Sequence, residues 1–261
     1  MLIIFGALKI ELIPLLKSIQ INNILKTGKT IIYQGSKNSI PVLIIQTGMG
    51  AKNAKRAAEF FRDNYSEYIK RNSAGPGENT EVLMIGFCGA ADRSIKVGDT
   101  IIYSSIKNIE HSGEESFKQN GIISLNSNRL SGSLLNSGFV TTTGANVPEV
   151  IIDPVVKKKL YADFDIRAID MESYWVGKVA LEMRLPFSCI RVVSDGALDI
   201  LPSYYGETAG IKMTINIMLS FLRSIFNRKE FTANISALKN TKKANSKLRK
   251  VSAELISRLC Q

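Results

Sequence analysis

Cysteine and histidine are scarce in this sequence, and their scarcity excludes several kinds of site. The three cysteines, Cys88, Cys189 and Cys260, are isolated and form no CxxC or Cys/His spacing. The sequence therefore supports neither a disulfide framework nor a structural zinc site, and it fits a reducing, cytoplasmic setting. The one histidine, His111, lies in a polar stretch that is typical of a solvated loop. A Ser-His-Asp triad or a multi-histidine metal centre is not expected.

Long apolar runs and nucleotide-binding glycine motifs are also missing. The strongest apolar run, Ile215–Phe226, contains Arg223 and is shorter than the roughly 20 residues that span a membrane. The N-terminus has no basic start and no small-residue cleavage site, so it predicts a first strand and not a signal peptide. Gly48-x-Gly50 lacks the third glycine of a dinucleotide-binding fingerprint, whose place Asn53 occupies. A nicotinamide-dependent dehydrogenase is therefore disfavoured, and the sequence predicts no cofactor.

Positive charge is abundant but unevenly distributed. The net charge is +11, and the nine basic and two acidic residues from Arg228 to Gln261 carry +7 of it. We therefore divide the chain into a catalytic domain, residues 1–227, and a basic C-terminal extension, residues 228–261. The extension is interpreted as a solvated, partly disordered tail or as an amphipathic helix on an anionic membrane surface. Nucleic-acid binding is not expected, because aromatic residues are nearly absent after Phe231.

Short apolar runs alternate with amphipathic stretches along the first 227 residues, and 45% of the chain is hydrophobic, enough for one core. This alternation predicts an α/β fold, with a mixed, largely parallel central sheet between two layers of helices. Polar stretches predict a loop at Asn72–Asn79 and a surface excursion at Asn108–Gly121. The predicted strands are Leu2–Leu8, Thr30–Gly35, Ile40–Thr47, Glu81–Gly86, Asp99–Ser105, Phe139–Thr143, Ile166–Ile169 and Phe187–Val193, and the predicted helices are Ile10–Ile19, Lys52–Ile69, Glu172–Arg184 and Gly206–Phe226.

Candidate functional segments follow three of the predicted strands. They are Gly48-Met49-Gly50, Gly86-Phe87-Cys88-Gly89 and Ser194-Asp195-Gly196. Ligands of parallel α/β sheets bind at the carboxyl ends of the strands, so these segments are expected to surround one site.

Three carboxylates lie at or near strand ends, and each has an ordinary explanation when taken alone. Asp195 ends an apolar strand, where partial desolvation suits a general acid, but it can also cap the next turn. Glu172 follows Asp170 by two residues, and one of the two side chains is expected to face solvent and the other a site. Acids are also favoured at a helix N-terminus, which is the ordinary explanation for Glu172 and for Glu11.

Together these pieces resemble the purine and uridine phosphorylase superfamily, in particular its nucleosidase branch. The resemblance runs from Leu2 to about Phe226. The segments that carry it are IFGALKIEL, TGMGAKNAKRAA, VLMIGFCGAADRSIKVGDTII and AIDMESYWVGKVALEMRLPFSCIRVVSD. The last is the most specific, because it places an acid, a Met-Glu pair, an apolar helix and a strand ending in Ser-Asp in one order. The resemblance implies a nucleoside phosphorylase-like fold and cleavage of the N-glycosidic bond of a nucleoside.

The resemblance also implies roles for the acidic residues. Glu11 would bind and polarise the attacking water, and Met171 and Glu172 would hold the ribose. Asp195 would protonate N7 of a purine leaving group. Such a reaction passes through an oxocarbenium-like ribosyl cation, which nearby negative charge stabilises.

Further residues would complete the pocket on the same resemblance. Ser194 would position the acid, Cys88 and Gly89 would line the ribose and base pocket, and Phe87 would stack on the ligand or close the pocket. Tyr205 falls where members of the superfamily often place an aromatic lid. A homodimer is expected.

The nucleophile is expected to be water. Phosphate-using members of the superfamily place an arginine and a serine where this chain has Met84 and Phe87. Arg56 or Arg191 could still approach an anion, although Arg191 is expected to order Asp195 or the sheet edge. A phosphate-dependent phosphorylase therefore stays open as an alternative.

Two further alternatives concern the substrate and the activity. GMGAKNAKRAA, GFCGAA and the Asp-Met-Glu-Ser segment also resemble hopanoid-associated nucleoside phosphorylases or adenosylhopane nucleosidases, whose lipid substrate would suit a basic tail. The other alternative is a nucleoside-binding or membrane-associated protein that has lost catalysis.

Overall fold

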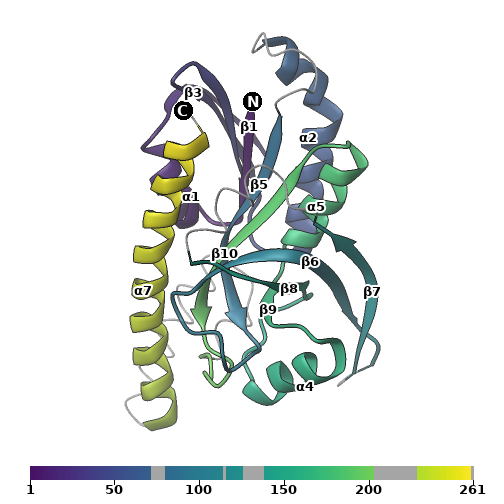
Figure 1. Cartoon of the computed structure of the whole chain (residues 1–261), viewed down its shortest axis with the longest axis vertical. Helices are drawn as coiled ribbons and strands as arrows, with labels where there is room; N and C mark the ends of the chain where they lie inside the picture. The colour runs from purple at the N-terminus through teal and green to yellow at the C-terminus, as the bar shows by residue number, and fades with distance from the viewer. Residues whose placement is uncertain (72–79, 114–115, 126–137, 203–227, 260–261) are drawn as a thin grey trace.

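The computed structural model describes residues 1–71, 80–113, 116–125, 138–202 and 228–259 (Figure 1). The predicted loop at Asn72–Asn79 and the predicted helix at Gly206–Phe226 lie outside the described residues. The described strands are β1 (Leu2–Gly6), β2 (Gln20–Thr27), β3 (Thr30–Lys37), β4 (Ile40–Gln46), β5 (Glu81–Ala90), β6 (Thr100–His111), β7 (Phe117–Ser124), β8 (Val140–Asn146), β9 (Ala168–Asp170) and β10 (Phe187–Asp195), and the described helices are α1 (Lys9–Leu16), α2 (Ala51–Arg71), α4 (Pro154–Phe164), α5 (Ser173–Glu182) and α7 (Arg228–Leu259).

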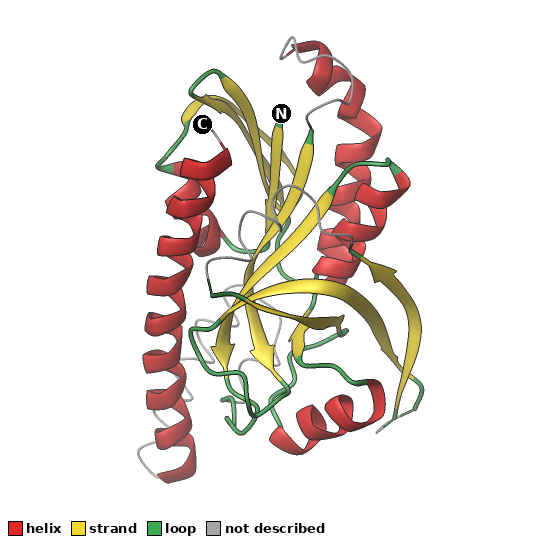
Figure 2. Cartoon of the chain, in the orientation of Figure 1, coloured by secondary structure: helices red, strands yellow, loops and turns green. Residues whose placement is uncertain are grey.

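Strand β1 is buried on both faces, and its alternating side chains separate two helical layers. Ile3 and Phe5 pack with residues of α2 and α5, whereas Leu2 and Ile4 pack with residues of α1 and α7. Figures 1 and 2 show α7 along one side of the sheet and α2 with α5 along the other. A continuous apolar run is what a strand covered by helices on both faces requires. The predicted three-layer α/β/α fold is confirmed.

The sheet is mixed, and its parallel part is central. Strands β4, β1, β5 and β10 lie side by side and run parallel. Strand β10 also pairs with β6, β6 with β8, β8 with β9 and β9 with β5, so five strands close into a ring. At the other edge β3 and β2 continue the sheet in antiparallel pairing. The carboxyl ends of the four parallel strands therefore lie at the same edge of the sheet.

The predicted surface excursion at Asn108–Gly121 is wrong. Strand β6 continues to His111 and pairs antiparallel with β7. The residues of β7 are either exposed or half-buried, and none is fully buried. The polar residues of this segment thus indicate strands that are exposed to solvent, and not the absence of strands.

Helix α4 and strand β2 were not predicted, although the sequence contains the start signal of the helix. The carboxylate of Asp153 accepts a hydrogen bond of 2.7 Å from the amide of Val155 and caps the helix. Pro154 follows at the first helical position, where no amide donor is needed. Helix α4 packs through Leu160 in a small core with β8 and β9.

The basic C-terminal segment forms the long helix α7, which packs on the sheet. Its buried residues Leu248, Val251 and Leu255 lie in the core with Ile4 of β1 and Leu12 of α1. The expectation of a solvated, partly disordered tail is therefore wrong for residues 228–259. No described helix is long and apolar enough to cross a membrane.

Because α7 contributes to the core, Leu248→Ala should lower the free energy of unfolding by about 2–5 kcal/mol, the usual loss for a fully buried leucine. Ile235→Ala on the same helix is the matched control. The side chain of Ile235 is 48% exposed, and its loss should change stability by less than about 0.5 kcal/mol. Denaturant unfolding monitored by circular dichroism measures both, and equal small effects would show that α7 contributes little to the core.

Candidate active site

A cavity of about 390 Å³ lies where β1, β5 and β10 end. Eight of the nine residues that the sequence singled out contribute to its wall. They are Glu11, Phe87, Cys88, Gly89, Met171, Glu172, Ser194 and Asp195. Tyr205 lies outside the described residues. The predicted residues therefore come from four separate segments and meet around one space.

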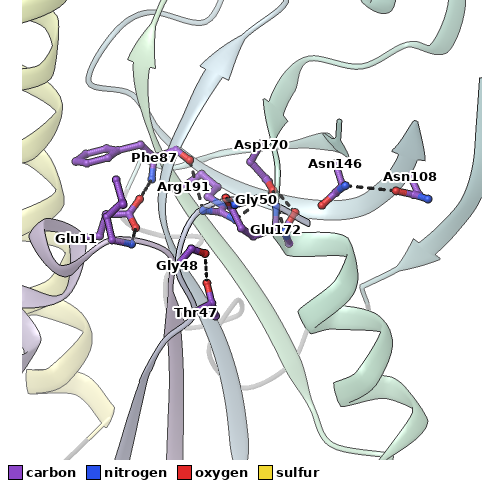
Figure 3. Close-up of polar contacts among 12 residues, drawn as sticks. Glu11, Thr47, Gly48, Gly50, Phe87, Asn108, Asn146, Asp170, Glu172 and Arg191 are labelled. Atoms are coloured by element: carbon purple, nitrogen blue, oxygen red, sulfur yellow. Dashed lines mark hydrogen bonds and ion pairs between the residues drawn. The ribbon is translucent and has the colours of Figure 1, made fainter. Parts of the chain in front are cut away.

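Glu11 lies on α1, just after β1, and is held by two backbone donors (Figure 3). One carboxylate oxygen accepts a hydrogen bond of 2.7 Å from the amide of Leu8, and the other accepts one of 2.9 Å from the amide of Phe87. The first bond is the helix N-terminal role that acids often have, and the second ties α1 to β5. Burial raises the pKa of Glu11, and the Arg191 cation and the backbone donors offset this only in part.

Glu172 precedes α5 and reaches the glycine turn after β4. Its Oε1 accepts a hydrogen bond of 2.7 Å from the amide of Gly50. Gly50 has φ of +94°, a backbone conformation that favours glycine, and this conformation directs its amide to the carboxylate. Burial raises the pKa of Glu172 to about 7, against the opposing effect of the Arg191 cation.

Asp170 is buried and acts as a local organiser, contrary to the expectation that one of the two acids would face solvent. Its Oδ1 accepts hydrogen bonds from the amides of Glu172 and Ser173, both of 2.8 Å, and its Oδ2 accepts one of 2.6 Å from the Ser173 hydroxyl. These bonds satisfy free amides at the start of α5. Residues two apart in an extended segment lie on the same face, so both acids of the pair turn inward and the expectation was wrong.

Arg191 occupies the centre of this acidic group. It was expected to order Asp195 or the sheet edge, but the acids that it contacts are Asp170 and Glu172. Its Nη2 lies 3.2 Å from Oδ1 of Asp170 and 3.8 Å from Oε2 of Glu172 (Figure 3). The side chain is fully buried and is not part of the cavity wall. Arg191 therefore balances the charge of the carboxylates and does not face a ligand.

Asp195 is held by one hydroxyl and one cation. Its Oδ1 accepts a hydrogen bond of 2.7 Å from Ser194, whose hydroxyl also lies 3.1 Å from the carbonyl of Cys88. Its Oδ2 lies 2.5 Å from Nζ of Lys157. A Cβ atom at Gly89 would lie 2.7 Å from the same Oδ2, so this carboxylate position requires glycine on β5.

Lys157 contacts Asp195 directly, and the sequence did not indicate it as a residue of this site. It lies on α4 in a run of three lysines that reads as a solvated charge cluster. The available signal was helical spacing, because Lys157 is three residues before the buried Leu160 and shares its face. Recognising that signal required the unpredicted helix.

Apolar residues complete the cavity. Phe87 and Met171 are partly buried at its wall, and Cys88 is buried. Burial raises the pKa of the Cys88 thiol well above its ordinary value, so the thiol stays neutral. The further wall residues Leu8, Ile10, Met49, Val147, Val150, Ile151, Ile169, Leu201 and Leu238 are also apolar. Carboxylates thus face a largely apolar space in which charge interactions are strong.

The fold and this site define a nucleoside phosphorylase-like α/β protein. The family model of the Phosphorylase superfamily matches residues 2–210. The chain belongs to the Phosphorylase superfamily and is an enzyme of that superfamily. No curated protein sequence matches the chain.

Solved structures with the same fold include several nucleosidases and a hydrolase. The 5′-methylthioadenosine/S-adenosylhomocysteine nucleosidase of Helicobacter pylori is 15% identical, with a TM-score of 0.69 over 98% of this chain and 97% of that one. Futalosine hydrolase of the same organism is 16% identical, with a TM-score of 0.69 over 98% and 97% of the two chains. S-adenosylhomocysteine nucleosidase of Streptococcus pyogenes is 14% identical, with a TM-score of 0.68 over 99% and 94%. At these identities the similarity establishes the fold.

If Arg191 balances the buried carboxylates, Arg191→Leu should lower the free energy of unfolding by about 3–5 kcal/mol at pH 8, because charges are left buried without a partner. Loss of the cation raises the pKa of Glu11 and of Glu172 further. A carboxyl whose pKa is raised by folding is most favourable when protonated, so the deficit should shrink toward pH 5 and grow as the pH rises through about 7.

Arg167→Leu is the matched control for this measurement. Arg167 lies 3.4 Å from Asp92, but its side chain is 45% exposed, so its loss should cost less than about 1 kcal/mol. Denaturant titrations of both variants between pH 5 and pH 8 decide the point. A deficit in Arg191→Leu that does not depend on pH would contradict charge balance.

Proposed function

We propose that the protein hydrolyses the N-glycosidic bond of a purine nucleoside of the adenosyl type. The observation that carries the proposal is the convergence of Glu11, Glu172 and Asp195 on one cavity from three distant segments. Each carboxylate is fixed by at least one hydrogen bond from the backbone or a hydroxyl. Groups held before the reaction starts stabilise developing charge without reorganisation.

The three carboxylates are assigned different tasks. Asp195 donates a proton to N7 of the purine and makes the base a better leaving group. Glu172 accepts hydrogen bonds from the ribose hydroxyls, for which its ionised form offers the most acceptor sites. Glu11 orients the attacking water on the opposite face of the sugar and accepts its proton.

The residues around the carboxylates are assigned to binding. Ser194 positions Asp195, and Met171 packs against the ribose. Phe87 covers the ligand, and Cys88 and Gly89 form the floor below ribose and base. Glycine at position 89 also leaves room for the carboxylate.

Water is favoured over phosphate by the charge of the cavity. Its described wall contains five acidic residues, Glu11, Glu149, Asp170, Glu172 and Asp195, and one basic residue, Lys157. The ammonium of Lys157 is already paired with Asp195. Such a wall attracts a ribosyl cation and repels a phosphate anion.

Asp195→Asn should reduce base release by about 10²–10⁴-fold, the usual contribution of a general acid. The assay follows adenine release from 5′-methylthioadenosine and S-adenosylhomocysteine, with and without phosphate. Asp165→Asn is the control: it removes an exposed carboxylate at a left-handed position that asparagine tolerates, and it should leave the rate unchanged.

Other outcomes of the same assay select the alternatives. Strict phosphate dependence with ribose 1-phosphate as product indicates a phosphorylase. Release from an adenosylhopane but not from the soluble nucleosides indicates the lipid substrate. Tight nucleoside binding without base release over hours indicates a binding protein, and near wild-type turnover of Asp195→Asn contradicts the assignment of the acid.

A cytoplasmic location, a homodimer and contact with an anionic membrane surface are further parts of the proposal. The outward face of α7 supports the last, because it exposes Lys239, Lys242, Lys243, Arg249 and Lys250. Co-sedimentation with vesicles of anionic lipid, and not with neutral vesicles, is expected in low salt. Equal binding to both would contradict membrane contact through these charges.

A further inference from the structure

Lys157 lies in an unfavourable place for a cation. Its side chain is 1% exposed, and it belongs to the first turn of α4, where the helix dipole disfavours positive charge. Burial of a lysine is costly unless its ammonium is paired and hydrogen-bonded. The contacts of the Lys157 ammonium must therefore offset the cost of burying it.

The ammonium of Lys157 connects α4 to the end of β10. Nζ lies 2.5 Å from Oδ2 of Asp195 and donates a hydrogen bond of 3.0 Å to the carbonyl of Gly196. Lys157 also contributes to the wall of the cavity. A cation thus lies against the proposed general acid on the same side as the ligand space.

The contact with Lys157 bears on how Asp195 obtains the proton that it donates. Both carboxylate oxygens of Asp195 accept hydrogen bonds, one from the Ser194 hydroxyl and one from the Lys157 ammonium, so in this arrangement Asp195 has no proton of its own to donate. Among the described residues, Lys157 carries the nearest proton with which Asp195 can be recharged. An arginine could not serve in this way, because its guanidinium keeps its proton.

We propose that Lys157 supplies the proton that Asp195 delivers to the leaving base, so that the two residues act as one acid. The inference rests on the proposed nucleosidase function and deepens it. Lys157 acts through Asp195 and is a positioning residue, whereas Asp195 touches the base.

The bond between C1′ and the base nitrogen breaks, and both electrons pass to the base. Asp195 takes a proton from the Lys157 ammonium and passes it to N7, so Asp195 begins and ends the step as a carboxylate and the ammonium becomes an amine. Water bonds to C1′ and gives its proton to Glu11. The amine gains a proton and Glu11 loses one when solvent enters after product release.

A purely structural role predicts different behaviour. In that case Lys157 fixes α4 to β10, and its loss weakens the site by the same factor at every pH. Proton supply predicts a loss that depends on pH. Without the lysine, Asp195 must take its proton from solvent, where protons become scarcer as the pH rises.

The test measures kcat/KM for adenine release from 5′-methylthioadenosine between pH 5 and pH 9, in wild type and in Lys157→Met. Proton supply predicts a loss of about 100-fold or more at pH 8 and of less than about 10-fold at pH 5, so the alkaline limb of the profile moves to lower pH. The other titratable groups of the cavity, Cys88, Glu11, Glu149, Asp170 and Glu172, are common to both proteins and leave the comparison intact.

Lys158→Met is the matched control, because it removes the neighbouring exposed lysine of α4 and should retain the wild-type profile. Circular dichroism checks that the variants fold. If Lys157→Met does not fold, Lys157→Arg replaces it. A guanidinium pairs with Asp195 but gives up no proton, so proton supply predicts a large loss at pH 8 and simple charge pairing predicts wild-type activity.

The outcomes separate this inference from the function on which it rests. No adenine release by the wild type overturns the nucleosidase function, and the proton-supply step with it. Release by the wild type with an unchanged rate in Lys157→Met overturns the inference alone. A loss of equal size at all pH values also overturns it and leaves Lys157 as a structural contact.

Discussion

The buried guanidinium of Arg191 is the interaction on which the rest of the site depends. It is fully buried on β10 beside Asp170 and Glu172, and its charge also acts on Glu11. Burial favours the neutral forms of Glu11 and Glu172, and the Arg191 cation opposes this effect. Asp170 in turn fixes the amides that begin α5 and so sets the position of Glu172. One cation therefore supports both the charge and the shape of the acidic group.

Close packing around Arg191 explains why glycine occurs at particular strand ends. A Cβ atom at Gly86 would lie 2.5 Å from a carboxylate oxygen of Glu11 and 2.7 Å from Nη1 of Arg191. Strand β5 therefore has no side chain where α1 and β10 bring opposite charges together. Gly89, three residues further on, leaves the equivalent space for Asp195. The GFCG segment keeps the end of β5 open for side chains from other elements.

The sequence predicts eight of the ten described strands and the shared location of the three carboxylates, because apolar runs and strand ends are local features. It predicts the partners of those carboxylates poorly. Arg191 and Asp195 are four residues apart, and regular alternation would put both on one face of β10. The pairing with β5 is irregular between Val193 and Asp195, so that alternation does not continue to the strand end. Lys157 could not be identified from the sequence, because its partner Asp195 lies 38 residues away and helix α4 was not predicted.

Two cations thus lie beside the acidic residues of this cavity, and they differ in location and in chemistry. Arg191 is outside the cavity wall and keeps its proton at any working pH, so it can hold negative charge in place but cannot take part in proton transfer. Lys157 is in the wall, and an ammonium, unlike a guanidinium, is able to give up a proton. Exchanging the arginine and the lysine would leave the net charge unchanged, but it would remove the difference between a cation that only balances charge and one that can transfer a proton. Under the proposed function, the identity of each cation, and not the number of charges, separates the carboxylate that binds the ribose from the one that acts as an acid.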